Sequence, residues 1–216
     1  MPHPDHIAEA DAPPYGPSAT AAEPQLAVPV RRRFTRAEYA QMADLGLFDG
    51  QRVELFEGDI LAMTPAGPGH SSANSRLLQV FFRLLLENQH LRVQEPLAPR
   101  DSESAPEPDL AVVAGAPGDY RDRHPEAALL VVEVSKATLA FDRVEKAQLY
   151  ARMGIPEYLI LNLIDNQLEY HAQPLPDSAT PGGWRYGTYR VLRVGETVRL
   201  EGLGGVEIPI GELIDT

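Results

Sequence analysis

The chain has 216 residues, a formal net charge of −12 and no cysteine. This length fits one domain with an appendage, and the lack of cysteine excludes disulfides, thiolate chemistry and cysteine-ligated zinc. Because the sequence has no apolar run of about 18 residues and no secretory signal pattern, we expect a cytoplasmic protein without a membrane span. The acidity argues against broad, non-specific binding to nucleic acid.

Residues 1–29 are rich in Ala and Pro and contain neither Lys nor Arg. Such a segment has little apolar surface to bury, so we predict a disordered tail in which His3 and His6 are incidental. Residues 30–216 are predicted to form a single domain.

The first half of this domain contains two helix patterns. Thr35 and Glu38 form a capping box, which predicts a helix that ends near Leu45. Residues 52–57 and 60–63 then alternate as a hairpin, and residues 91–97 are predicted to be a strand. Between them, a helix is predicted from Ser71 to about Asn88, with a core-facing stripe at Leu77, Leu78, Phe81, Phe82 and Leu85.

The second half begins with two strongly apolar runs, Leu110–Ala114 and Leu129–Val134, which are typical of strands covered on both faces. A helix is predicted over residues 143–153, with Asp142 as its N-cap and Glu145 completing a capping box.

Further strands are predicted towards the C-terminus. Residues 157–163 and 168–171 form one predicted hairpin, residues 173–183 a loop, and residues 184–200 a last hairpin. Together these elements predict an α/β fold, with a central mixed β-sheet flanked by α-helices and extra antiparallel strands at the C-terminus.

Each apolar run carries one carboxylate where an apolar residue would be expected. Asp109 opens the first run and Glu133 interrupts the second. Burying an unpaired charge costs many kcal/mol, so a cation should meet them. Lys146 lies on the same side of the predicted helix as Leu149 and Tyr150, so it can reach back over both carboxylates.

Lys136 is the other lysine of the chain and an alternative cation. In the usual E-x-K arrangement the lysine follows the glutamate by two residues, but that position holds Ser135. Lys136 is three residues after Glu133, so an unbroken strand would point it to the other face. We therefore favour Lys146.

These residues resemble a known family. Pro108-Asp109, Glu133-Val134-Ser135, Asp142-Arg143-x-x-Lys146 and Gly154-Ile155-Pro156-Glu157-Tyr158 are similar to motifs of the Uma2 family, which belongs to the PD-(D/E)XK nuclease superfamily. The resemblance spans about residues 34–172, which would be the core of a restriction-endonuclease-like domain with residues 173–216 as a β-rich extension.

The resemblance implies a metal-binding Asp and Glu, with the lysine moved to the helix: Asp109, Glu133 and Lys146. It also places Glu54 and His70 at the site. From the residues alone, Glu54 could equally be an exposed strand residue paired with Arg52. His70 could bind a phosphate oxygen at the start of a helix, or it could cap or pack there.

The expected chemistry is hydrolysis of phosphodiester bonds in DNA. Asp109 and Glu133 offer hard oxygen ligands, with the Val134 carbonyl as a third, and these suit Mg²⁺ or Mn²⁺. Lys146 would remain protonated and stabilise charge in the transition state. Gln148 and Tyr150 could position the substrate, although Tyr150 also suits helix–sheet packing.

Two alternatives remain open. Glu133 and Lys146 could form a buried ion pair with no role in catalysis. The chain could then be an inactive module that binds nucleic acid or a protein partner, and the C-terminal strands could serve a homodimer.

Overall fold

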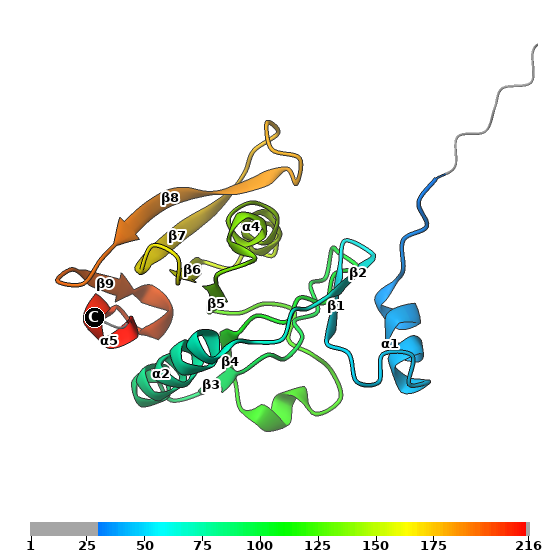
Figure 1. Ribbon diagram of the computed structural model, residues 1–216, viewed down its shortest axis with the longest axis horizontal. Coiled ribbons are helices and arrows are strands. Elements are labelled where there is room, and N and C mark those ends of the chain that lie inside the picture. Colours follow the sequence, from blue (N-terminus) through cyan, green and yellow to red (C-terminus); the bar gives the residue numbers. More distant parts are fainter. Residues whose placement is uncertain (1–29, 215–216) are drawn as a thin grey trace, which may run out of the picture. The chain divides into compact units, whose positions relative to one another are not determined.

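The structure, a computed structural model, describes residues 30–214, so the predicted tail at residues 1–29 lies outside it. From Arg33 onward the described residues form one compact unit. Its centre is a six-stranded sheet in the order β3-β4-β5-β6-β7-β8 (Figure 1). The strands are β3 (Gln89–Arg92), β4 (Leu110–Ala114), β5 (Leu130–Ser135), β6 (Glu157–Asn162), β7 (Gln167–Pro176) and β8 (Trp184–Leu192).

The predicted mixed sheet is confirmed, because β5 and β6 are parallel and every other pair of neighbours in this sheet is antiparallel. Apart from α1 (Arg36–Asp44) and α2 (Pro68–Leu84), the helical elements are short. They are α3 (Leu139–Phe141), a π-helical turn (Asp142–Lys146), α4 (Ala147–Arg152), α5 (Ile210–Leu213) and the 3₁₀ turns Pro117–Tyr120 and Glu201–Leu203.

Both faces of the sheet are buried at its central strands β4, β5 and β6, as the apolar runs predict. Leu110 and Val112 of β4 pack into a core that includes α2 (Pro68–Leu84) and the C-terminal hairpin β9 (Thr197–Leu200) and β10 (Val206–Pro209). Ala111 and Val113, which alternate with them along β4, pack on the opposite face into a second core that includes α4. Figure 1 shows α2 beside β3 and β4, and α4 beside β7 and β8. Glu133 is buried on β5 between Val132 and Val134.

The N-terminal predictions largely agree with the structure. Helix α1 (Arg36–Asp44) has the complete Thr35–Glu38 capping box. β1 (Val53–Phe56) and β2 (Asp59–Ala62) form the predicted hairpin. No helix among residues 30–214 is both long and apolar enough to cross a membrane.

Helix α2 and strand β3 differ from the predictions. Helix α2 begins at Pro68 rather than Ser71, so His70 lies inside its first turn instead of before it. The stripe on α2 is rotated, since Leu78 and Phe82 are exposed and the buried side is made of Ala73, Leu77, Val80 and Phe81. Strand β3 ends at Arg92, because the backbone of Gln94 turns into the left-handed region with φ of 52°.

The C-terminal hairpins are also paired differently. β8 pairs with β7, and β9 pairs with β10, so the predicted 184–200 hairpin is wrong. β7 continues through Pro174 and Pro176 into the predicted loop. Its pairing with β6 ends at Ala172, and prolines are tolerated beyond that point because one edge of the strand needs no backbone donor.

Candidate metal centre

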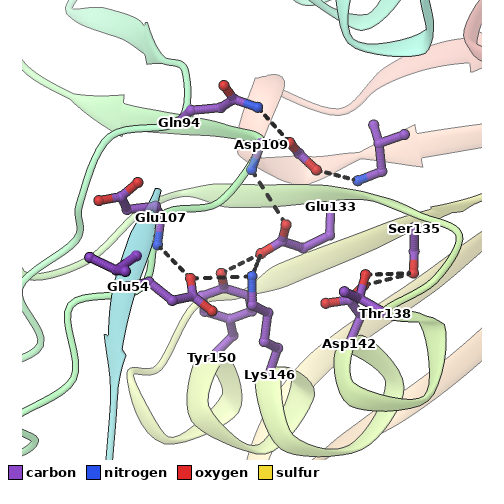
Figure 2. Close-up of polar contacts among 12 residues, drawn as sticks. Glu54, Gln94, Glu107, Asp109, Glu133, Ser135, Thr138, Asp142, Lys146 and Tyr150 are labelled. Carbon is purple, nitrogen blue, oxygen red and sulfur yellow. Dashed lines mark hydrogen bonds and ion pairs between the residues drawn. The ribbon is translucent and has the colours of Figure 1, made fainter. Parts of the chain in front are cut away.

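The two predicted carboxylates meet where β4 begins and β5 ends. Leu110 pairs with Val132, so Asp109 lies one step further on, opposite Glu133. The backbone N–H of Asp109 donates to Glu133 Oε2 at 3.4 Å (Figure 2). Both side chains line the same cavity, of about 580 Å³. The sheet register therefore brings these carboxyl groups to one site.

Asp109 is held by four donors. Its Oδ2 accepts from the Val134 N–H at 2.8 Å and lies 3.2 Å from His70 Nε2. Its Oδ1 accepts from the amides of Asn74 and Gln94, each at 3.1 Å. Burial alone would raise the pKa of Asp109, but His70 and the other donors outweigh it and lower the pKa to about 2. Asp109 is therefore ionised at neutral pH.

Glu133 is bound to the helix that covers the sheet. Its Oε1 accepts from Lys146 Nζ at 2.8 Å and from the Tyr150 hydroxyl at 2.7 Å. Burial raises the pKa of Glu133, while the adjacent Lys146 ammonium opposes this rise and favours the carboxylate. Burial lowers the pKa of Lys146, but the nearby carboxylates of Glu133 and Glu54 raise it by more. The net effect is a raised pKa, so the lysine stays protonated.

Glu54 lies on the other side of Lys146. Its Oε2 is 3.5 Å from Lys146 Nζ and accepts from the Glu107 N–H at 3.2 Å. Glu54 is fully buried, which excludes the alternative of an exposed strand residue. Its Oε1 is buried without a hydrogen-bond partner, although it belongs to a side chain that lines the cavity.

A π-helical turn over Asp142–Lys146 brings Lys146 to this place. Asp142 is not the N-cap, because the helical segment begins three residues earlier, at Leu139. The buried Asp142 Oδ2 accepts instead from the hydroxyls of Ser135 at 2.6 Å and Thr138 at 2.7 Å. The Asp142 carbonyl accepts from Ala147 N–H across the wide turn and from the Tyr158 hydroxyl at 3.1 Å.

The side chains fit a hard divalent cation. The carboxylates that line the cavity belong to Glu54, Glu107, Asp109, Glu133 and Asp142, while Lys146 is the one buried Lys or Arg lining it among residues 30–214. This excess of buried negative charge and the unpaired Glu54 oxygen both favour a bound cation. Within residues 30–214, no three His, Asp or Glu side chains form a preassembled metal cage. A centre here would combine two carboxylates with a backbone carbonyl.

The structure brings together Glu54, His70, Asp109, Glu133, Val134 and Lys146 around one cavity. Lys136 also lines it but is exposed. Gln148 instead accepts from the Gly182 N–H at 2.6 Å and does not line the cavity. Sequence reasoning missed Asn74, Gln94 and Glu107, whose polar side chains stand in a helix and two loops without a distinguishing pattern.

Comparison with solved structures identifies the class of fold. The chain is similar to a protein from Anabaena variabilis ATCC 29413, described as a putative nuclease belonging to DUF820, with a TM-score of 0.63 and 11% identity. The match covers 83% of this chain and 97% of the other. At this identity the likeness shows a shared fold.

The family is established by sequence. The model of the Uma2 family, described as a putative restriction endonuclease, matches residues 36–211. The chain therefore belongs to the Uma2 family, as its motifs predicted. No curated protein matches the chain.

Proposed function

We propose that the protein is a divalent-metal-dependent endonuclease that hydrolyses phosphodiester bonds of DNA. The observation that carries this proposal is the meeting of Asp109, Glu133 and Lys146 at one cavity. Membership of the Uma2 family and the fold shared with a protein described as a putative nuclease both support it.

Asp109, Glu133 and the Val134 carbonyl would hold Mg²⁺ or Mn²⁺. Such an ion lowers the pKa of a bound water and offsets the charge of a phosphate. The Tyr150 hydroxyl and Lys146 orient Glu133 through its Oε1, which leaves Oε2 directed towards Asp109.

Lys146 acts as a fixed positive charge. It remains protonated beside Glu133 and Glu54, so it cannot accept the proton of an attacking water. Its role is to stabilise the negative charge that develops on the phosphate in the transition state. Glu54 keeps the lysine in place from the opposite side.

The test is incubation of the purified protein with plasmid DNA and with single-stranded DNA, in Mg²⁺ or Mn²⁺. We expect cleavage that EDTA abolishes and that Asp109→Asn and Lys146→Met each reduce by at least about 100-fold. Asp101→Asn removes an exposed carboxylate away from the cavity and should cleave like the wild type.

Equal cleavage by the wild type, Asp109→Asn and Lys146→Met would indicate a contaminating nuclease. If the wild type binds neither ion and cleaves neither DNA, the Glu133–Lys146 pair is structural and the chain is a binding module. Either result overturns the proposal.

A further inference from the structure

His70 contacts two of the residues that would hold the metal ion. Its Nε2 lies 3.2 Å from Asp109 Oδ2. The ring also contacts the backbone of Val134, the residue whose N–H donates to Asp109 Oδ2. Helix α2 starts at Pro68, so His70 is in its first turn and lines the cavity. The imidazole thus faces the site from the side opposite Lys146's helix.

The spacing of these atoms suits ligands of a single ion. Adjacent ligands of an octahedral ion, each about 2.1–2.2 Å from the metal, lie about 3.0 Å apart. The 3.2 Å between His70 Nε2 and Asp109 Oδ2 is close to that value. The imidazole therefore needs only a small adjustment, and the loss of one proton, to share an ion with Asp109.

Asn74 supports the ring in this orientation. It follows His70 by one helical turn, and its Nδ2 lies 3.4 Å from His70 Nδ1 and 3.1 Å from Asp109 Oδ1. The Asn74 Oδ1 is buried without a partner. A metal-bound imidazole needs an acceptor for its other N–H. Rotation of the Asn74 amide would supply one and would give up the Asn74 hydrogen bond to Asp109 Oδ1, a carboxylate whose charge the metal ion would then offset.

We propose that His70 is a nitrogen ligand of the metal centre and makes the site prefer Mn²⁺ over Mg²⁺. The inference rests on the proposed function, because it needs the centre formed by Asp109 and Glu133. Mg²⁺ binds oxygen ligands and rarely accepts imidazole, whereas imidazole suits first-row transition metals. A site with only the two carboxylates and the Val134 carbonyl would lack this nitrogen.

The experiment measures metal binding by the full chain without DNA. Isothermal titration with Mn²⁺ and with Mg²⁺ gives the two affinities, and pulsed electron paramagnetic resonance of bound Mn²⁺ detects directly coordinated imidazole nitrogen. The variants are His70→Gln and Asp109→Asn. His124→Gln is the matched control, because His124 lies at a different cavity. Circular dichroism checks that each variant folds.

We expect the wild type and His124→Gln to bind Mn²⁺ at least tenfold more tightly than Mg²⁺, with an imidazole nitrogen signal. His70→Gln should weaken Mn²⁺ binding 10- to 100-fold, leave Mg²⁺ binding within threefold and lose the nitrogen signal. If the wild type and His124→Gln give the nitrogen signal and His70→Gln does not, the coordinated nitrogen belongs to His70.

Two results overturn the inference in different ways. If Asp109→Asn abolishes Mn²⁺ binding but a folded His70→Gln keeps both its affinity and the nitrogen signal, the metal centre stands and His70 is not its ligand. If the wild type binds neither ion, the centre itself fails, and the proposed function fails with it.

Discussion

Lys146 holds an unusual place for a lysine, because only 2% of it is exposed and two carboxylates lie within 3.5 Å of its ammonium group. Buried ion pairs often contribute little net stability, since desolvation offsets attraction. Removing one partner is nevertheless costly, because the other charge remains buried. Lys146 therefore stabilises the fold and carries the proposed chemistry with the same contacts.

Lys146→Met should lower the free energy of unfolding by about 3 kcal/mol at pH 7, because Glu133 and Glu54 then face each other without a cation. Lys136→Met is the control, since Lys136 is exposed and its removal should change stability by less than about 0.5 kcal/mol. Urea unfolding measures both. Equal effects of the two substitutions would contradict this account of the buried cation.

His171 lies away from the site, among Tyr158, Tyr186 and Tyr189. Its Nε2 is buried without a partner, and burial lowers its pKa from 6.5 to about 4. The unfolded chain takes up this proton near pH 6.5, whereas the folded chain does not until about pH 4. Stability therefore falls as the pH decreases through this window, by up to about 3 kcal/mol from this residue.

His171→Phe should remove that part of the acid sensitivity while keeping an aromatic ring in the cluster. The measurement is urea unfolding at several pH values between 7 and 4.5, for the wild type and the variant. Parallel stability curves would show that His171 is not the group responsible.

The residues that sequence reasoning missed all donate an N–H group to a buried carboxylate of the site. Asn74 and Gln94 donate amide N–H groups to Asp109, and Glu107 donates its backbone N–H to Glu54. Ionised side chains in apolar strands are conspicuous in a sequence, but their neutral partners come from distant segments. Only the fold, which brings residues 74, 94 and 109 together, identifies them.

The helical segment over residues 139–152 contains a π-helical turn that the sequence pattern did not predict. Asp142 and Glu145 have capping-box spacing, so a helix start at residue 143 was the natural interpretation. Within the helix, Asp142 is instead bound by Ser135 and Thr138, which are close only after β5 has formed. The strands were predictable because their apolar runs report burial directly, whereas the π-turn depends on tertiary contacts.

This π-turn allows two anchors to act together. Arg143 forms a bidentate pair with the buried Glu169, at 2.8 Å for its Nε. Three residues later, Lys146 reaches Glu133 on another strand. In a regular α-helix, removal of one residue between them would rotate the two side chains by about 100° relative to each other. The extra residue in the turn therefore fixes the lysine at the site.

Deletion of Val144 tests this account, because its side chain lies in the turn and is 49% exposed. We expect the deletion to lower the free energy of unfolding by about 2–3 kcal/mol and to reduce DNA cleavage at least 100-fold, since one anchor must break. Val144→Ala keeps the chain length and should stay within about 0.5 kcal/mol and close to wild-type activity. Normal cleavage by the deletion variant would refute the account in which the extra residue of the π-turn positions Lys146.

At the scale of the whole molecule, the net charge of −12 opposes binding of the proposed substrate, DNA, which is a polyanion. Binding must then depend on a few local cations and on the metal ion. Arg52, Arg76 and Lys136 line the cavity that contains the carboxylates, so they are the groups placed to contact phosphates. Composition indicated the acidity, but the grouping of these cations comes from three separate segments and required the fold.

The salt dependence of DNA binding measures how many phosphates are contacted. With about three cations, the logarithm of the association constant for duplex DNA should fall with the logarithm of salt concentration with a slope of about −3. Fluorescence anisotropy of a labelled duplex with Lys146→Met, in Ca²⁺ and 50 to 300 mM NaCl, gives this slope without cleavage. Lys136→Ala added to that variant should make the slope shallower by about one. A slope near −8 would mean that a far larger basic surface contacts the DNA, and the cavity would not be the main binding site.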